Sequence, residues 1–179
     1  QALALNQYAK PACRVIVVAN PANTNCLVAL SVAENIPSEN FSCLTRLDQE
    51  RLRGMVAAQV GLTNPGLSPR DVKSIAIFGN HSATQVPVIS AGYIDKDGKQ
   101  TSLNDLVEDS WATGSLIPTV QQRGAEVIKF LGASSALSAA NGVGRHVRSI
   151  MEGIVDGLSL SSETIKDPFS MGILSRGHY

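Results

Sequence analysis

The feature that most constrains the fold is a pair of short apolar runs separated by one helical pattern near the start of the chain. Arg14 to Ala19 is rich in β-branched residues and stops at Asn20-Pro21, which is typical of a strand buried on both faces of a parallel sheet. A helix capped by Asn23 or Thr24 follows, and Phe41 to Leu44 returns as the next strand. This order predicts a βαβ unit and hence an α/β fold.

The rest of the chain continues to alternate between helical and extended patterns. Asp-Gly at 97 and 98 accepts the positive φ angles of a tight turn, so a hairpin is expected around it. The full set of later predictions is a helix over Thr45 to Gln59, a strand over Val72 to Phe78, hairpin strands over Val86 to Ile94 and Lys99 to Leu103, helices over Leu116 to Leu131 and Ser134 to Met151, and a last strand over Phe169 to Leu174.

Composition excludes several classes of protein. Fifteen basic and fifteen acidic residues give a net charge of zero, so charge favours neither a nucleic acid nor a membrane surface as partner. With 44% hydrophobic residues the chain also differs from the polar, self-repelling composition of disordered proteins. No apolar run approaches the roughly 18 residues needed to span a bilayer.

The cysteines and histidines indicate neither a disulfide framework nor a metal site. Cys13, Cys26 and Cys43 are an odd number without a Cys-x-x-Cys pair, which fits a reducing compartment and buried thiols. The three histidines are isolated and lack metal-ligand spacing. We therefore expect no metal site.

Three side chains form the strongest candidate for chemistry. Asp48 and Arg51 are three residues apart on a predicted helix, so they occupy neighbouring positions on one face, and His81 follows the exit of a predicted strand. A buried carboxylate beside a histidine raises the histidine pKa and fixes its tautomer, which suits proton transfer near neutral pH. Arginine presents a planar pair of donors that matches a carboxylate. Together they predict proton transfer on an anionic substrate.

Simpler interpretations remain open from the pattern alone. Asp48 and Arg51 can form an ordinary surface ion pair, which contributes only about 0–1 kcal/mol, and His81 can be a plain turn residue. Asn20 lies where open α/β sheets bind ligands, at the carboxyl end of a strand, but an Asn-Pro turn accounts for it equally well.

Three motifs in register show a resemblance to a known family. They are Val15-Ile16-Val17-Val18-Ala19-Asn20-Pro21-Ala22-Asn23-Thr24-Asn25, Leu44-Thr45-Arg46-Leu47-Asp48 with Arg51, and Gly79-Asn80-His81-Ser82-Ala83-Thr84-Gln85. The chain closely resembles the lactate/malate dehydrogenase family, in its branch of malate dehydrogenases of the cytosolic type. The likeness continues in order through Thr119 to Ala125 and Ser134 to Ala140 to Phe169-Ser170-Met171-Gly172.

The resemblance implies a role for each site residue. His81 would be the proton acceptor and donor, Asp48 its orienting carboxylate, and Arg51 the clamp for the substrate carboxylate. Asn20 would hydrogen-bond the substrate oxygen near the nicotinamide of NAD, with Val18 and Ala19 lining the cofactor site. Ser134 or Ser135 would add a hydroxyl. The implied reaction is NAD-dependent, reversible oxidation of (S)-malate to oxaloacetate, a step of the tricarboxylic acid cycle.

The resemblance also implies a domain organisation. Residues 1–44 would be the last part of a Rossmann-type dinucleotide-binding domain, and 45–179 most of an α+β catalytic domain, incomplete at its C-terminus. The family's first βαβ unit, with its Gly-rich pyrophosphate cradle, and the mobile specificity loop are expected to be missing, so the chain alone is expected to be inactive. In the family the enzyme is a cytoplasmic homodimer.

Two alternatives to malate dehydrogenase are left open by these departures. One is a related 2-hydroxy-acid dehydrogenase with a different substrate preference, because the missing loop is where such specificity is set. The other is a catalytically silent family member with a structural role, against which the intact Asp48, Arg51 and His81 argue.

Overall fold

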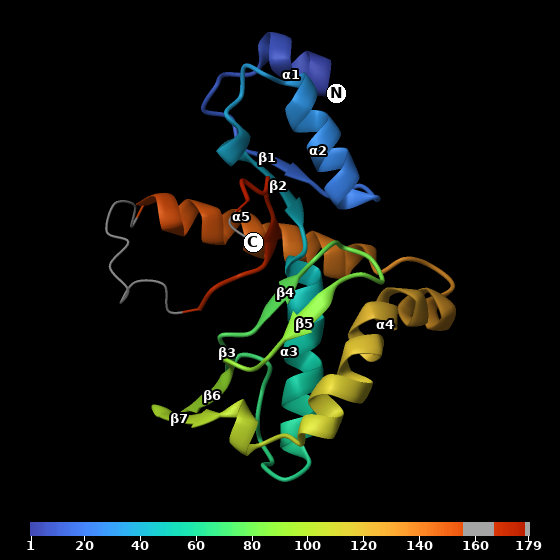
Figure 1. Ribbon diagram of the computed structural model, residues 1–179, viewed down its shortest axis with the longest axis vertical. Helices are drawn as coiled ribbons and strands as arrows, with labels where there is room; N and C mark the ends of the chain where they lie inside the picture. Colours follow the sequence, from blue (N-terminus) through green and yellow to red (C-terminus); the bar gives the residue numbers. More distant parts are fainter. Residues whose placement is uncertain (156–166, 178–179) are drawn as a thin grey trace.

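Two separate clusters of buried apolar side chains organise the chain. The computed structural model describes residues 1–155 and 167–177. One cluster, around Cys26, Ala33 and Phe41, fills the N-terminal part, and the other, around Leu52 and Ile75, fills the larger part that follows. Figure 1 shows these parts at opposite ends, with one long helix crossing between them. The mixed helices and strands confirm the predicted α/β class.

The N-terminal part is the predicted βαβ unit. Strands β1 (Val15–Val17) and β2 (Phe41–Leu44) pair in parallel, and helix α2 (Ala22–Val32) lies in the connection between them. A short strand, β8 (Met171–Gly172), joins β2 antiparallel from the other end of the chain. A first helix, α1 (Ala2–Tyr8), and a 3₁₀ turn at Ser38–Asn40 were not predicted.

Two details of this unit correct the sequence prediction. The first strand is shorter than Arg14 to Ala19 and only half-buried, because among the described residues β1 lies at an edge of its sheet and has a neighbouring strand on one side only. Helix α2 begins at Ala22 with Pro21 as its N-cap, and no side chain caps it. Asn23 and Thr24 therefore lie inside the helix.

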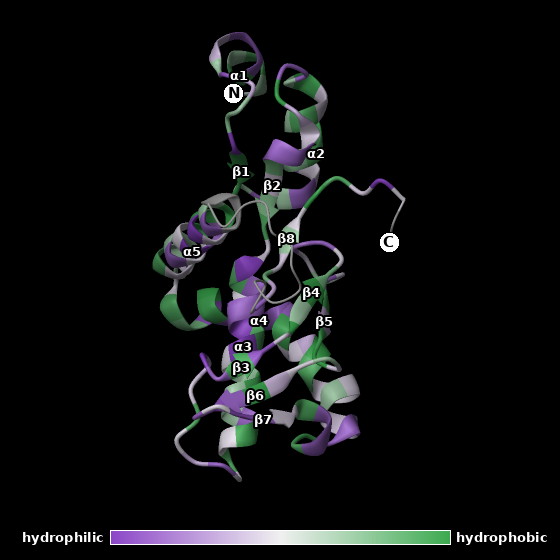
Figure 2. Cartoon of the chain, turned by 90° about the vertical axis from the view of Figure 1, so that its left-hand side faces the viewer, coloured by the Kyte–Doolittle hydropathy of each residue, from purple (hydrophilic) through white to green (hydrophobic). Residues whose placement is uncertain are grey.

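Helix α3 (Arg46–Gly61) is the predicted second helix, with Thr45 as its N-cap. Its apolar face enters the larger core through Leu52, Val56 and Val60. Its first turns are hydrophilic in Figure 2, yet Asp48, Gln49 and Arg53 are buried there. Buried polar groups need partners, so this helix end must carry a network of contacts.

The strands that follow α3 are shorter than predicted. The expected strand from Val72 to Phe78 is two strands, β3 (Val72–Lys73) and β4 (Ala76–Phe78). They separate at Ser74, whose φ of 54° interrupts an extended chain. Strand β3 pairs with β6 and β4 with β5, so the two belong to different sheets.

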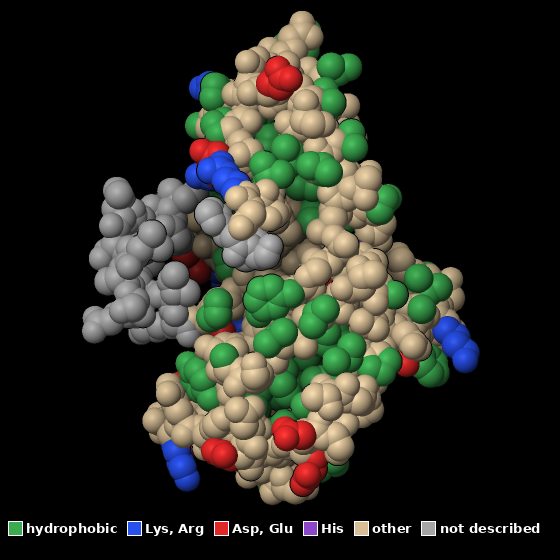
Figure 3. Space-filling model, in the orientation of Figure 1, with side chains coloured by type: hydrophobic (Ala, Val, Ile, Leu, Met, Phe, Trp, Pro, Cys, Tyr) green, Lys and Arg blue, Asp and Glu red, His purple; other side chains and the backbone are tan. Residues whose placement is uncertain are grey.

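The predicted hairpin is confirmed around Asp97 and Gly98, which have φ angles of 54° and 80°. Its strands are β6 (Tyr93–Lys96) and β7 (Lys99–Ser102), and the expected strand from Val86 to Ile94 is divided into β5 (Val86–Val88) and β6. A 3₁₀ turn, Leu103–Asp105, and a π-helical turn, Trp111–Ser115, follow. Figure 3 shows hydrophobic side chains gathered over β4 and β5, where Phe78 and Val86 are 54% and 46% exposed.

Helices α4 (Leu116–Leu131) and α5 (Ala136–Val155) agree with their predictions, and Gly132 ends α4 with a positive φ. Helix α5 packs on both α3 and β2. At Gly142 its backbone approaches Leu47 of α3, while most of the small residues that precede it are exposed. No helix within the described residues is both long and apolar enough to cross a membrane.

His146 joins the two parts of the structure. Its Nε2 shares a 3.1 Å hydrogen bond with Ser42 Oγ of β2, and its ring packs edge-on against Phe169. The side chain is fully buried, and burial, with a contribution from nearby Arg46, lowers the pKa of His146 to about 4. The imidazole is therefore neutral at pH 7 and serves as a packed link in the core.

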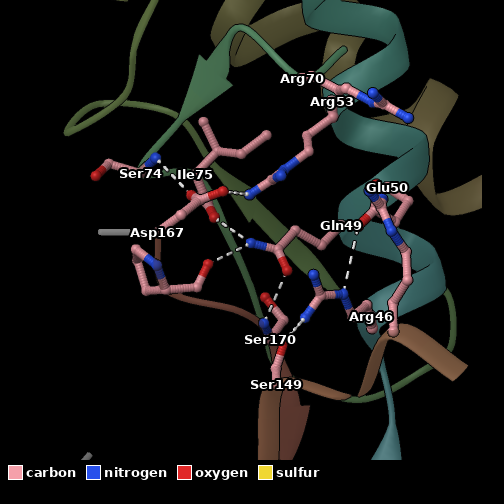
Figure 4. Close-up of polar contacts among 12 residues, drawn as sticks. Arg46, Gln49, Glu50, Arg53, Arg70, Ser74, Ile75, Ser149, Asp167 and Ser170 are labelled. Carbon is pink, nitrogen blue, oxygen red and sulfur yellow. Dashed lines mark hydrogen bonds and ion pairs between the residues drawn. The ribbon is translucent and has the colours of Figure 1, made fainter. Parts of the chain in front are cut away.

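Gln49 is the second link, and Figure 4 shows its amide between α3 and the C-terminal segment. Its Nε2 donates to Ile75 O at 2.7 Å and to Pro168 O at 2.9 Å, and its Oε1 accepts from Ser170 N at 2.9 Å. Ser170 Oγ in turn accepts from Ile77 N at 2.8 Å. One buried side chain thus holds three backbone groups from two distant segments.

Replacing Gln49 tests this link. Gln49→Leu leaves the three backbone groups without their partner, at about 1–3 kcal/mol for each buried group. We expect unfolding free energy to fall by about 3 kcal/mol or more in a urea titration followed by circular dichroism. Gln59→Leu is the matched control, because Gln59 lies half-buried on the same helix and its side chain bonds no described residue; its change stays below about 1 kcal/mol. Equal effects of the two variants would contradict the role of Gln49.

Candidate active site

The start of α3 and the loop after β4 bring the three predicted residues into one cluster. Asp48 and Arg51 project from the first two turns of α3. His81 follows Gly79, whose φ of 76° turns the chain sharply as β4 ends. A Cβ at Gly79 would lie 2.5 Å from Thr84 O, so the turn that presents His81 requires glycine.

The closest contact in the cluster joins His81 to Asp48. The Nδ1–H of His81 donates to Oδ2 of Asp48. The Asp48 side chain is only 1% exposed, and the His81 side chain 21%. The carboxylate therefore fixes the ring orientation and the tautomer, and Nε2 is left to exchange a proton with another group.

The electrostatics of His81 suit proton transfer. The hydrogen bond that His81 donates to Asp48 raises the pKa of His81; burial opposes this, and the negative charge of Asp48 adds to it. The positive charge of Arg51 lowers the same pKa. The net direction is upward from the ordinary value, so the protonated imidazole is stabilised in the folded protein.

Arg51 completes the cluster from the same helix face. Its Nη1 donates to Oδ1 of Asp48 at 3.4 Å, and its Nη2 donates to Oγ of Ser135 at 3.3 Å. The side chain is 15% exposed, and burial lowers the pKa of Arg51. A solvated surface ion pair is therefore the wrong interpretation of Asp48 and Arg51, because both groups are largely withdrawn from water.

Two residues to which the sequence analysis gave no role at the site contact this cluster. Asn23 Oδ1 accepts from the backbone N of His81 at 2.8 Å and so ties the start of α2 to the loop after β4. The backbone of α4 at Gly124 faces the guanidinium of Arg51 without a side chain between them. Both residues lie in stretches that carry the family resemblance. No spacing along the chain relates either residue to His81 or Arg51, so the residues alone gave no signal for these contacts.

The remaining predicted residues lie apart from these contacts. Val18, Ala19 and Asn20 are exposed where β1 ends, and the Asn20 side chain makes no hydrogen bond to a described residue. Of the two candidate serines, Ser135 contacts Arg51, whereas Ser134 is exposed. Within residues 1–155 and 167–177, no group of three His, Cys, Asp or Glu is placed to hold a metal ion.

Comparison with known proteins gives a consistent result. A family profile described as lactate/malate dehydrogenase, alpha/beta C-terminal domain, matches residues 45–179. The chain is 48% identical over 174 residues to "Malate dehydrogenase, cytoplasmic" of Bos taurus, covering 97% of this chain and 51% of that protein. It thus spans about half the length of the curated relatives it matches.

Solved structures give the same picture. The crystal structure of malate dehydrogenase from Naegleria fowleri aligns with a TM-score of 0.80 at 41% identity, over 100% of this chain and 50% of that one. Trichomonas vaginalis lactate dehydrogenase in complex with NADH and oxamate aligns with a TM-score of 0.83 at 29% identity, over 98% of this chain and 49% of that one.

The geometry predicts how His81 titrates. Because its pKa is raised above the ordinary 6.5, its protonated form stabilises the fold; this contribution is full below pH 6.5 and is lost as pH rises through the folded pKa. An NMR titration of the imidazole should give a midpoint above 6.5, and Asp48→Asn should lower it. A midpoint that is unchanged in Asp48→Asn would show that the carboxylate does not control the ring.

Proposed function

The chain belongs to the lactate/malate dehydrogenase family, and on this premise we propose that it is the catalytic half of an NAD-dependent malate dehydrogenase. The proposed reaction is the reversible oxidation of (S)-malate to oxaloacetate. The observation that carries the proposal is the cluster of His81, Asp48 and Arg51, which joins a proton acceptor to a carboxylate binder. The chain spans about half the length of the matched malate dehydrogenases. We therefore assign the activity to a complete subunit, by which we mean a chain of the relatives' length that contains this one.

We propose a domain boundary between Leu44 and Thr45. Residues 1–44 would form the last part of the dinucleotide-binding domain, and residues 45–179 the substrate domain. The two apolar clusters support it, as does a family profile that begins at residue 45. The exposed Val18, Ala19 and Asn20, at the carboxyl end of a parallel strand, fit the nicotinamide end of NAD. When bound, NAD supplies the hydride acceptor for C2 of the substrate.

His81 takes the proton in this mechanism. Its Nε2 accepts the hydroxyl proton of malate as the hydride leaves C2, and it returns the proton in the reverse direction. Asp48 is already bonded to Nδ1, so the imidazolium forms beside a fixed negative charge. That charge raises the pKa of His81 and lowers the cost of holding the proton.

Arg51 holds the substrate in place. Its contacts with Asp48 and Ser135 restrict the guanidinium before substrate arrives, and its remaining N–H groups are available to the C1 carboxylate. Two parallel charge-assisted bonds orient C2 as well as binding the anion. We propose that Asn20 hydrogen-bonds the substrate oxygen near the nicotinamide.

The names of the relatives favour one substrate and one cellular location. The relatives at 42% to 48% identity are named cytoplasmic malate dehydrogenases, which favours malate and a cytoplasmic location. The likeness to a lactate dehydrogenase at 29% identity keeps another 2-hydroxy acid as the alternative. A homodimer is also proposed, supported by exposed apolar side chains such as Phe130 at 81% and Leu137 at 87%.

Substituting His81 tests the proton-transfer step. In the complete subunit, His81→Asn should lower kcat for oxaloacetate reduction by about 10²- to 10⁴-fold, the usual value of general acid–base catalysis. NADH affinity, measured by calorimetry, should stay unchanged. Near-normal turnover in this variant would rule out His81 as the proton carrier and leave the cluster with a structural role only.

Substituting Arg51 tests the clamp. Arg51→Lys keeps the charge but loses the planar pair of donors, so oxaloacetate binding should weaken by about 2–5 kcal/mol while NADH affinity and melting temperature change little. Arg176→Lys is the matched control, because Arg176 forms an exposed ion pair with Glu39, at 62% and 66% exposure. The checks are steady-state kinetics and a thermal melt. An unchanged kcat/KM in Arg51→Lys would remove Arg51 from the site.

A further inference from the structure

One hydrogen bond joins the two parts of the structure at the site itself. Asn23 lies in the first turn of α2, and its Oδ1 accepts from the backbone N of His81 at 2.8 Å. Asn23 belongs to the N-terminal part, whereas His81 belongs to the larger part that follows it. The candidate proton carrier is therefore attached to the part of the chain that carries Asn20.

His81 is held at two points by two different helices. Asp48 of α3 bonds Nδ1 of the ring, and Asn23 of α2 bonds the backbone N. Within residues 1–155 and 167–177, the bond to Asn23 is the only hydrogen bond of the His81 backbone. A ring held at Nδ1 alone still tilts when its backbone moves, so the position of Nε2 depends on both contacts.

The rest of the loop after β4 does not hold His81 against another element. Its internal hydrogen bonds join loop residues to one another and therefore move with the loop. At the far end of the loop, Gln121 Nε2 of α4 donates to Gln85 O at 2.8 Å. A cavity of about 290 Å³ is lined by both Asn23 and Asn80, so the loop has space to shift if Asn23 releases it.

Asn23 is itself supported from two sides. It lies in α2, which packs on both β1 and β2. The backbone of Gly172 in β8 lies against its amide, since a Cβ at Gly172 would be 3.2 Å from Asn23 Nδ2. Figure 2 shows β8 between α2 and β4. The acceptor for His81 therefore comes from a packed support.

The same short turn carries Asn20, the residue proposed for the substrate oxygen. Asn20 lies three residues before Asn23, where β1 has ended and α2 is about to begin. Asn25 Nδ2 donates to Ala19 O at 3.0 Å, and this bond closes the turn. The distance between the substrate oxygen and Nε2 of His81 is therefore controlled by one turn of the chain.

We propose that Asn23 is the positioning residue for His81. It holds the imidazole where Nε2 meets the substrate hydroxyl while C2 faces the nicotinamide, so that proton and hydride leave malate from one geometry. This role rests on the proposed function, because it requires His81 to carry the proton. A misplacement of about 1 Å costs a reaction of this kind roughly 100-fold in rate.

Two substitutions of Asn23 in the complete subunit test this role. Asn23→Ala removes the acceptor, and we expect kcat for oxaloacetate reduction to fall by about 10- to 100-fold. The KM for oxaloacetate and the affinity for NADH should change little, because Arg51 on α3 binds the carboxylate and does not contact Asn23. Asn23→Asp keeps an oxygen acceptor at the same place, so its kcat should be close to that of the unchanged subunit.

A hydrogen isotope effect identifies the step that slows. We expect NADH deuterated at the transferred position to give an isotope effect on kcat in Asn23→Ala at least as large as in the unchanged subunit, because the transfer itself has become slower. A smaller isotope effect would mean that another step had slowed, and it would overturn the role of Asn23.

Asn40→Ala is the matched control. Asn40 is half-buried like Asn23, and its Nδ2 donates to Pro11 O at 2.9 Å, so it also fastens two segments of the N-terminal part. It precedes β2, however, whereas the site lies where β1 ends. The two alanine variants should lower the melting temperature by similar small amounts, because each loses one such bond and alanine favours a helix. Only Asn23→Ala should lower kcat.

The possible failures are distinguishable. An unchanged kcat in Asn23→Ala, or a kcat in Asn23→Asp as low as in Asn23→Ala, would overturn the role of Asn23 and leave the proposed function intact. Equal losses of kcat in Asn23→Ala and Asn40→Ala would overturn it as well, since they would reduce Asn23 to a structural residue. An unchanged complete subunit that does not reduce oxaloacetate would instead overturn the proposed function, and this role with it.

Discussion

The burial of the Asp48 carboxylate is the constraint on which the rest of the site depends. A charged group with 1% of its surface exposed is costly unless opposite charge and donors surround it. His81 and Arg51 meet that requirement, one on each oxygen. The loop after β4 must therefore lie against the first turns of α3, and Asn23 fastens the same loop to α2. The arrangement that neutralises a buried charge also places a proton acceptor beside a carboxylate binder.

Helix α3 carries three polar functions because successive positions face different neighbours. A step of one residue turns a helix by about 100°, so Asp48 faces the loop of His81 while Gln49 faces the C-terminal segment. Arg53 lies one turn after Gln49 on nearly the same face and meets Asp167 of that segment. The helix is thus buried on more than its apolar side. The cluster at His81 and the contacts with the C-terminal segment are attached to one rigid element, so a shift of α3 would alter both.

Long-range contacts hold the two apolar clusters together. Helix α5 crosses between them, with His146 bonded to Ser42 and packed on Phe169. Strand β8 extends the N-terminal sheet with residues from near the other end of the chain. The buried imidazole is neutral at pH 7, since its pKa is lowered to about 4, and it joins the two parts through packing and one hydrogen bond. These contacts hold the end of β1, where Val18 to Asn20 are exposed, in a fixed position relative to α3.

The sequence alone determined the elements whose causes are local. The alternation of apolar runs predicted the parallel pair of β1 and β2, apolar periodicity predicted α3, α4 and α5, and Asp97-Gly98 predicted the hairpin; the spacing of three placed Asp48 and Arg51 on one helix face. Only the tertiary structure decided what depends on distant neighbours. The local sequence does not indicate that Ser74 divides a strand between two sheets, or that Asn23 accepts a hydrogen bond from the backbone of His81 rather than capping a helix. The burial of Asp48 and the contacts of Gln49 with the C-terminal segment likewise depend on which surfaces meet, because burial and hydrogen bonding between segments far apart in the chain leave no periodic trace in the sequence.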